Sequence, residues 1–368
     1  MKKMLGVIQL DHENDLLKEL TYFRCVAATP FASRYRLIDF VLSNMVTAQV
    51  HEVALFARKK YRSLMDHLGT GQPWDLNRKN GGFFILPPDW NDPTDRSLGD
   101  LQHFHNNRDF FMRSQADYVL ISGSTHLCTI DYQAVFEQHL QTNADVTLIY
   151  HPDYKTSAHN QNKLKLQFNK KGAVQALIND QQNPHLFMNM YIISKKVLLE
   201  LVDYCISNHK SDLLLDGVFA HLDHLAIHSY AYDGYHAVID SVESYYKYSM
   251  ELLQDINYQK LFLQANPIFS KIKDEPPTQY KKGAKVSHSL IANGCIVEGT
   301  VKNSILFSGV HVQKGAIVEN SIIMQRCTIQ HSSQLSHVIL DKNIQVTPYQ
   351  RRKGTIEAPY LIAKSQVI

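Results

Sequence analysis

The chain has 368 residues, of which 44% are apolar and 20% are charged, a composition typical of a globular protein that is long enough for two domains. Its 38 basic and 35 acidic residues give a formal charge of +3, which indicates neither a nucleic-acid nor a membrane partner. The five cysteines are scattered and include no C-x-x-C pair, which argues against a disulfide framework or a structural zinc site and favours a reducing compartment.

Short apolar runs alternate with helical stretches in the first half of the chain. The run at 4–10 is too short for a signal peptide or a membrane span, so we expect a cytoplasmic protein that begins with a β-strand. Alternation of this kind predicts a Rossmann-like, mixed but mostly parallel sheet with helices on both faces. Further strands are expected at 53–56, 118–121, 146–150 and 187–193, and helices at 39–48, 61–68 and 195–205.

The pattern of apolar and helix-forming residues changes near residue 265. The segment NPIFSKIKDEPPTQY (266–280) contains three prolines and is typical of an extended linker. Beyond it, related tetrapeptides recur, with Ser289, Ser304 and Ser321 separated by 15 and 17 residues and His337 following after 16. This period favours the stacked coils of a hexapeptide-repeat β-helix, with a β-sandwich as the alternative. We therefore expect domains at 1–260 and 281–368, joined by a linker at 261–280.

The turn that follows the strand at 118–121 lacks an expected acid. Ligands of parallel α/β sheets bind beyond the carboxyl ends of the strands, and a carboxylate at such a position would hold a metal ion or orient a nucleophile. In VLISGSTHL (119–127) the turn offers Ser122, Ser124, Thr125 and His126, and the next acid is Asp131.

Several segments carry a resemblance to one enzyme family. RYRLIDFVLSN (34–44), HLGTGQPWDL (67–76), VLISG (119–123), ESYY (243–246), the linker PIFSKIKDEPPT (267–278) and ILDKN (339–343) are similar to ADP-glucose pyrophosphorylase, also called glucose-1-phosphate adenylyltransferase. The resemblance implies a nucleotide-diphospho-sugar transferase domain followed by a left-handed β-helix, in a tetramer that serves glycogen synthesis. It also implies four requirements for catalysis: a glycine-rich phosphate loop, a phosphate lysine, two Mg²⁺-binding aspartates and a sugar-phosphate lysine.

The phosphate-binding parts of that pattern are missing. No glycine lies between Gly6 and Gly69, and the loop instead places Asp11, Glu13 and Asp15 where a triphosphate would bind. The family's phosphate lysine falls on Val26, within the segment RCVAATPF. Both changes disfavour the binding of a nucleoside triphosphate.

The metal and sugar-phosphate positions differ as well. The first aspartate of the family falls on Ser124 or Thr125, depending on the register, and the second falls on Val238. Asp240, two residues further on, lies on the same strand face and would restore one acid only. The sugar-phosphate lysine falls on Asp180, which reverses its charge, and the family's D-F-G-K-D is D-L-L-L-D at 212–216.

Because these five catalytic features are missing, the chain resembles the regulatory, non-catalytic (GlgD-type) subunit of the family. The resemblance then implies a catalytic pyrophosphorylase subunit as partner in a heterotetramer, with no metal or cofactor of its own. It also places Arg24 and Arg36 where family members bind a sugar-phosphate effector, with Arg34 beside them, because guanidinium groups bind phosphate in bidentate geometry. The alternative for Arg36 is a structural pairing with Asp39.

Two other functions stay open at this point. The chain is either a self-sufficient Mg²⁺-dependent nucleotidyltransferase that uses Asp131, Asp212 or Asp240 as substitute ligands, or a stand-alone sensor of sugar phosphates. The acidic loop, which contains no glycine, disfavours the enzyme but does not separate a sensor from a regulatory subunit.

Overall fold

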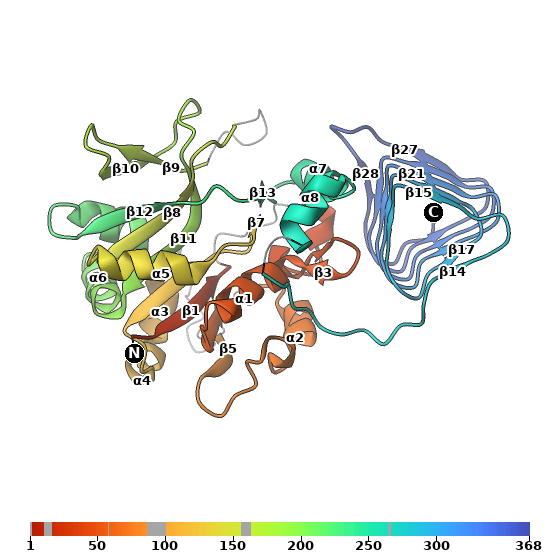
Figure 1. Cartoon of the computed structure of the whole chain (residues 1–368). Helices are drawn as coiled ribbons and strands as arrows, with labels where there is room; N and C mark the ends of the chain where they lie inside the picture. Colours follow the sequence, from red (N-terminus) through yellow and green to blue (C-terminus); the bar gives the residue numbers. More distant parts are fainter. Residues whose placement is uncertain (1, 11–16, 58, 87–100, 156–162, 264–265) are drawn as a thin grey trace. The chain divides into compact units, whose positions relative to one another are not determined.

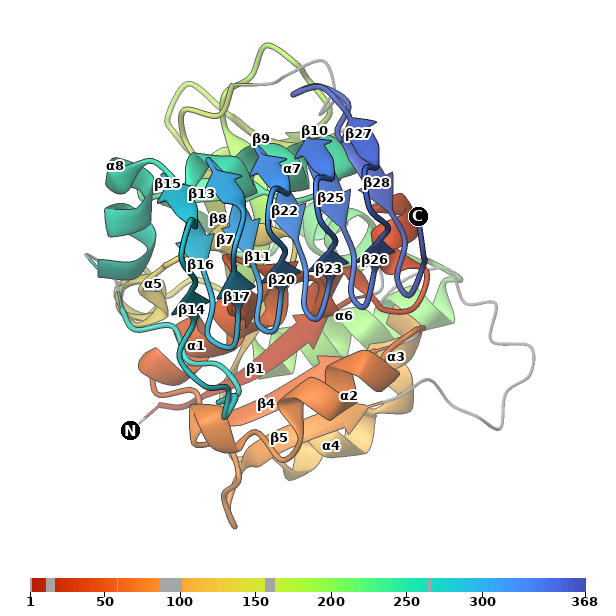
Figure 2. The ribbon, with the colours of Figure 1, turned by 90° about the vertical axis from the view of Figure 1, so that its right-hand side faces the viewer.

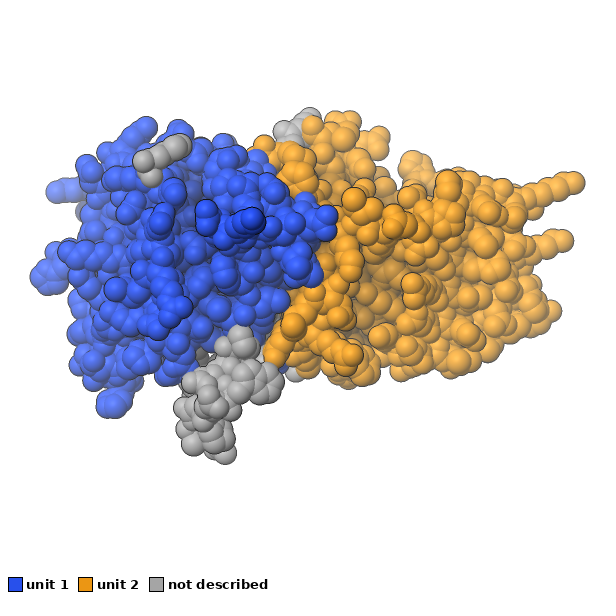
Figure 3. Space-filling view, turned by 90° about the horizontal axis from the view of Figure 1, so that it is seen from below, with its two compact units in different colours: residues 1–12, 41–59, 68–236 blue, residues 13–40, 60–67, 237–368 orange. Residues whose placement is uncertain are grey.

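The computed structural model describes residues 2–10, 17–57, 59–86, 101–155, 163–263 and 266–368 and divides the chain into two compact units (Figures 1 and 3). Unit 1 consists of the described residues of 1–12, 41–59 and 68–236, and unit 2 consists of those of 13–40, 60–67 and 237–368. The expected acidic loop of Asp11, Glu13 and Asp15 lies outside the described residues. The domain boundaries expected from the sequence stay a prediction.

Unit 1 contains a mixed sheet of nine strands within its described residues, in the order β10-β9-β11-β6-β1-β4-β5, with β8 paired to β11 and β12. The pairs β1–β4, β1–β6, β4–β5 and β8–β12 are parallel. β11 runs antiparallel to β6 and β8, a direction that an apolar run in the sequence does not specify. The strands are β1 Met4–Gln9, β4 Glu52–Phe56, β5 Gly82–Leu86, β6 Tyr118–Ser122, β8 Val146–His151, β9 Lys165–Phe168, β10 Val174–Ile178, β11 Leu186–Ser194 and β12 Ile227–Ala231.

Helices cover both faces of this sheet, as the alternating sequence predicts. Leu5 and Val7 of β1 belong to a core that also contains apolar residues of α3, α4 and α6, whereas a Cβ at Gly6, on the opposite face, would approach Met45 of α1 to 2.8 Å. Every residue of β1 is buried, which is typical of a parallel strand covered on both sides. The other elements of unit 1 are α3 Leu101–Asn106, α4 Arg108–Arg113, α5 Tyr132–Gln141, α6 Lys195–Ser207, the short strand β7 His126–Cys128, the 3₁₀ segments Gln72–Trp74 and Phe219–His221, and a π-helical segment Leu213–Val218.

Unit 2 combines N-terminal segments of the chain with a parallel β-helix. The β-helix contains three sheets of five parallel strands, and its successive coils stack on one another (Figure 2). The first sheet contains β14 Gln279–Tyr280, β17 Ile296–Val297, β20 His311–Val312, β23 Thr328–Ile329 and β26 Gln345–Val346. The second sheet contains β15 Lys285–Ser287, β18 Thr300–Lys302, β21 Ile317–Glu319, β24 Gln334–Ser336 and β27 Arg351–Lys353. The third sheet contains β16 Leu290–Ile291, β19 Ile305–Leu306, β22 Ile322–Ile323, β25 Val338–Leu340 and β28 Tyr360–Ile362.

The remaining elements of unit 2 come from both ends of the chain. α1 Leu37–Thr47, α2 Arg62–Leu68 and β13 His236–Val238 cross the boundary between the units. Within unit 2 lie the 3₁₀ segments Lys18–Thr21 and Val26–Ala28, β2 Pro30–Phe31, β3 Tyr35–Arg36, α7 Val242–Glu251, α8 Asp255–Tyr258 and a π-helical segment Gln259–Leu263. The expected linker has no regular structure from 266 to 278.

The serine repeat builds the β-helix and confirms its prediction over a β-sandwich. Ser289 Oγ accepts a hydrogen bond from the backbone N–H of Ser304 (3.2 Å), and Ser304 Oγ accepts one from Ser321 N–H (3.1 Å). Ser321 Oγ in turn accepts from Val338 N–H (3.1 Å), so each coil is hydrogen-bonded to the next through the repeated side chain. Small aliphatic side chains at matching positions fill the interior, including Val297, Val312, Ile329 and Val346.

No helix within the described residues is both long and apolar enough to cross a membrane.

Candidate functional site

The turn after β6 is where the sequence leaves out the expected acid. Ser124 is buried and Thr125 is half-buried, and the backbone of the turn is bonded to β11 through Gly123 N–H and Asn189 O (3.3 Å). Asn189 has a positive φ of 53° at an irregularity of β11, and a Cβ at Gly123 would lie 3.0 Å from its Nδ2. A side chain at 123 would therefore displace the Asn189 amide, and the turn presents hydroxyl groups and an imidazole but no carboxylate.

Three imidazoles gather next to this turn in unit 1. His126 Nδ1 and His236 Nε2 lie 2.9 Å apart, and the His236 ring stacks on both His126 and His151, with centroids 5.1 and 5.2 Å away. Burial, followed by the neighbouring His151 and Lys163, lowers the pKa of His236 to about 3. Burial also holds the pKa of His126 well below its usual value. Both imidazoles are therefore neutral near pH 7, and one donates its N–H to the other.

The degenerate positions in unit 2 are apolar and buried. Val26 begins a 3₁₀ turn and is 1% exposed, and Val238 ends β13 with no exposed surface. Neither side chain can bind a phosphate or a metal ion. Asp240 is half-buried, and its backbone N–H donates to Ser244 Oγ (3.0 Å) just before α7.

Two of the proposed substitute metal ligands have structural roles instead. Asp131 Oδ1 accepts hydrogen bonds from Gln133 N–H (2.9 Å) and Ala134 N–H (3.4 Å) and so caps α5. Asp212 Oδ1 accepts from Leu215 N–H (2.7 Å) at the start of the π-helical segment. Asp180 is exposed and accepts from Gln182 N–H (2.9 Å) in a turn. Among the described residues, no group of three or more His, Cys, Asp or Glu side chains could hold a metal ion.

In unit 2, Arg24 forms a buried ion pair with the β-helix. Its Nη2 donates to both carboxylate oxygens of Asp341, at 2.8 and 2.9 Å, and the two side chains are only 3% and 1% exposed. Asp341 Oδ1 also accepts from Lys342 N–H (2.8 Å), which fixes the carboxylate at the corner of a coil. The other guanidinium nitrogen of Arg24, Nη1, is buried and has no hydrogen-bond partner within the described residues.

Arg36 lies near Arg24 but does not pair with Asp39 through its side chain. Its Nη1 donates to Ser63 O (2.6 Å) and Ser63 Oγ (3.1 Å), whereas its backbone N–H donates to Asp39 Oδ2 (3.0 Å). The buried Asp39 carboxylate also accepts from Ser270 Oγ (2.6 Å) and contacts His67 Nε2 (2.5 Å). Asp39 thus fixes the backbone around Arg36, and its charge also favours the protonated guanidinium, against burial, which lowers the pKa of Arg36.

Two lysines complete a positive cluster around these arginines. Burial, together with Arg36 and Arg24, lowers the pKa of Lys342 to about 7, although Asp341 opposes the shift. Burial and Arg36 likewise lower the pKa of Lys273. We call Arg24, Arg36, Lys273 and Lys342 the Arg24 cluster.

Arg34, the third arginine expected at an effector site, is exposed at the edge of this cluster. Its guanidinium carbon lies 5.8 Å from the centre of the Tyr35 ring, and its charge is close enough to lower the pKa of Lys273. The three predicted arginines thus lie in one region of unit 2, but only Arg24 and Arg36 are substantially buried.

Sequence reasoning did not find several residues of these sites. Asp341, Lys342 and Lys273 lie in the segments ILDKN and PIFSKIK, which carry the family resemblance, yet nothing in their spacing connects them to Arg24. His126 and His236 are 110 residues apart and show no ligand spacing.

Comparison with known proteins places these features in a family. Residues 16–233 match the family model described as nucleotidyl transferase, and residues 276–351 match the one described as GlmU-like, C-terminal hexapeptide. The chain is 40% identical to the glycogen biosynthesis protein GlgD of Bacillus subtilis, over 99% of this chain and 97% of that protein. It is 42% identical to the GlgD protein of Geobacillus stearothermophilus over the same shares. It is 30% identical to the glucose-1-phosphate adenylyltransferase of Clostridium perfringens, over 89% of this chain and 85% of that enzyme.

Proposed function

The chain belongs to the GlgD family of glycogen biosynthesis proteins, relatives of glucose-1-phosphate adenylyltransferase, and we propose that it is a regulatory, catalytically degenerate subunit of such an enzyme. The observation that carries the proposal is the turn after β6, where Ser124, Thr125 and the His126–His236 pair occupy the place at which the resemblance requires a metal-binding carboxylate. A neutral pair of imidazoles attracts no Mg²⁺, because that ion prefers anionic oxygen ligands.

The alternative of an active nucleotidyltransferase has less support. Asp131 and Asp212 accept backbone hydrogen bonds at the beginnings of helical segments, so neither carboxylate is free to move to a metal ion without exposing those N–H groups. Asp240 would have to supply metal binding alone. The resemblance implies two Mg²⁺-binding aspartates, so one of the two would still be missing.

We propose further that the Arg24 cluster binds a phosphorylated effector. Support comes from the buried Nη1 of Arg24, which has no hydrogen-bond partner within the described residues, and from the pKa of Lys342, which burial and then Arg36 and Arg24 lower. A phosphate group would accept hydrogen bonds from the guanidinium groups and favour the protonated form of Lys342. Binding of the effector would then act on the catalytic partner through the interface between the subunits.

The deciding experiment measures pyrophosphate release from ATP and glucose 1-phosphate with Mg²⁺. The assay compares this chain, the catalytic adenylyltransferase of the same organism, and an equimolar mixture of the two. We expect no release by this chain alone and a rate in the mixture above that of the catalytic protein. A comparable rate for this chain alone would overturn the proposal.

A second measurement separates a regulatory subunit from a stand-alone sensor. Calorimetric titration of the isolated chain with glucose 1-phosphate, fructose 6-phosphate and fructose 1,6-bisphosphate tests the Arg24 cluster directly, with R36M as the test variant and R108M, which alters an exposed arginine of unit 1, as the matched control. Effector binding without any change in the rate of the mixture would identify a sensor. Loss of binding in R36M alone would assign the effector to the cluster.

A further inference from the structure

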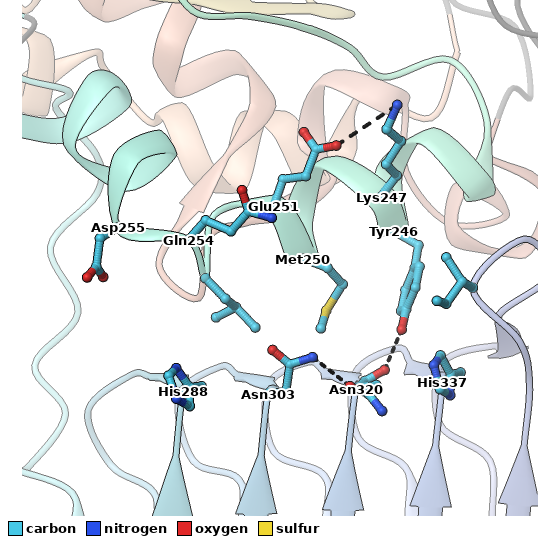
Figure 4. Close-up of a pocket in the computed structure, with 12 residues that line it drawn as sticks. Tyr246, Lys247, Met250, Glu251, Gln254, Asp255, His288, Asn303, Asn320 and His337 are labelled. Atoms are coloured by element: carbon cyan, nitrogen blue, oxygen red, sulfur yellow. Dashed lines mark hydrogen bonds and ion pairs between the residues drawn. The ribbon is translucent and has the colours of Figure 1, made fainter.

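A groove of about 580 Å³ lies within unit 2, between α7–α8 and one corner of the β-helix (Figure 4). Its floor is formed by the corner ladder, which we define as His288, Asn303, Asn320 and His337, one from each of four successive coils. The helical side contributes aromatic, apolar and polar side chains, among them Tyr246, Met250 and Gln254. None of these residues belongs to the Arg24 cluster or to the imidazole group of unit 1.

The corner ladder is a regular row of hydrogen-bonding groups. All four residues adopt positive φ angles, between 43° and 53°, so their side chains leave the coil in the same direction. Neighbouring coils are spaced by about 4.8 Å, so the four positions span roughly 14 Å. Asn303 Nδ2 donates to Asn320 Oδ1 (2.5 Å), and within the described residues Asn303 Oδ1 and Asn320 Nδ2 have no other hydrogen bond. The acceptor Asn303 Oδ1 and the donor Asn320 Nδ2 therefore lie at the two outer ends of this amide pair.

The helical wall of the groove is largely apolar where it meets the ladder. Tyr246 and Met250, one turn apart on α7, point toward the ladder, and Tyr246 OH donates to Asn320 O (2.6 Å) (Figure 4). Lys247 and Glu251 point away from it and form an ion pair at 3.9 Å (Figure 4). Lys247 is the only lysine among the described residues that line the groove, and it does not face the floor.

This combination selects against anions and in favour of neutral polyhydroxyl ligands. Within the described residues that line the groove, a phosphate would meet no lysine or arginine on the floor, and the Asp255 carboxylate would repel it. A sugar hydroxyl both donates and accepts, which matches the paired amide groups of Asn303 and Asn320. The C–H faces of a sugar ring would pack on Met250 and the Tyr246 ring. The coil spacing is also close to the length of one hexopyranose ring.

We propose that this groove binds a linear oligosaccharide of neutral hexoses, with one sugar ring on each step of the corner ladder. The site would hold the oligosaccharide along this corner of the β-helix. The inference stands on the groove alone and does not require the proposed regulatory function.

The test is calorimetric titration of the full chain with maltotetraose, with cellotetraose and glucose 6-phosphate as comparison ligands. The double variant N303G/N320G removes both amides, and glycine adopts their backbone conformation without strain. The matched control N343G makes the same change at another corner, where Asn343 also has a positive φ (59°). We expect saturable binding of a neutral tetraose, weakened about tenfold or more in N303G/N320G and unchanged in N343G.

Two outcomes would overturn the assignment. The first is no saturable binding of either tetraose by folded wild-type protein, and the second is equal binding by wild type and N303G/N320G. If either outcome is found and a catalytic partner binds wild type but not N303G/N320G, the groove is assigned to the subunit interface instead. Thermal unfolding of all variants confirms that a loss of binding is not a loss of fold.

Discussion

Replacement of Asp341 by Asn removes the negative charge from the buried contact that joins the N-terminal segment of unit 2 to its β-helix. Asn keeps the shape of the side chain but can no longer balance the guanidinium of Arg24, which lies 2.8 and 2.9 Å from the two carboxylate oxygens. Both side chains are almost fully buried, at 3% and 1% exposure, so little water can take over the role of the carboxylate. D341N therefore leaves a buried and uncompensated positive charge.

The expected loss follows from this burial. Removal of one partner of a buried ion pair destabilises a protein by about 3–5 kcal/mol, because the remaining charge keeps its desolvation penalty. Here the remaining charge also has like-charged neighbours, since Arg24 and Arg36 already lower the pKa of Lys342. We therefore expect D341N to lose about 4 kcal/mol of unfolding free energy, or roughly 10 °C in Tm.

The assay is a double-mutant cycle followed by thermal and urea unfolding. R24M/D341N should be more stable than D341N, because the double variant contains no unpaired buried charge. The matched control is D203N, which removes one charge from the exposed Arg108–Asp203 pair (3.0 Å) and should change stability by less than about 0.5 kcal/mol. The reasoning is refuted if D341N stays within about 1 kcal/mol of wild type, or if R24M adds its full effect to D341N.

Three further changes have defined outcomes. Because the pKa of Lys342 lies at about 7, binding of a phosphorylated effector should weaken as the pH rises from 6 to 8.5, and titrations of K342M should show much less of this dependence. The folded-state pKa of His236 (about 3) lies below its unfolded value of about 6.5, so the unfolded state binds more protons between these values and stability falls as the pH drops below 6.5. H236Q should reduce that slope by about one proton in urea unfolding at pH 4.5–7. Ser241 Oγ caps α7 by accepting from Ser244 N–H (3.0 Å), so S241A should cost about 1 kcal/mol in the same assay.

Local repetition made the β-helix predictable from the sequence. Each coil must place an inward aliphatic side chain and a hydrogen-bonding serine at the same positions, so the spacing of Ser289, Ser304 and Ser321 follows directly from the coil length. The strands and helices of unit 1 were predictable for a similar reason, since apolar runs and their periods are local. The direction of β11 was not, because a fully buried strand has the same apolar pattern in either orientation.

The sites depend on pairs that no local pattern contains. Arg24 and Asp341 are separated by 317 residues, and either one alone is typical of an exposed charged residue. The missing acids could be recognised at Ser124 and Val238, because a motif specifies which residue type should be present. The pairing of His126 with His236 could not be recognised, because the two residues are 110 positions apart in the sequence.

The turn after β6 and the Arg24 cluster differ in whether their polar and charged groups all have partners, and this difference bears on their proposed roles. A buried carboxylate at the turn after β6 would need a cation to balance its charge, whereas the neutral His126–His236 pair is satisfied by the hydrogen bond between its two rings and needs none. The Arg24 cluster is the reverse case. Arg24 is buried and Arg36 and Lys342 are half-buried, burial and the charges of Arg36 and Arg24 lower the pKa of Lys342 to about 7, and Arg24 Nη1 has no hydrogen-bond partner within the described residues. Under the proposed function, unit 1 therefore needs no metal ion, and an anion bound in unit 2 would accept the hydrogen bond that Arg24 Nη1 lacks within the described residues.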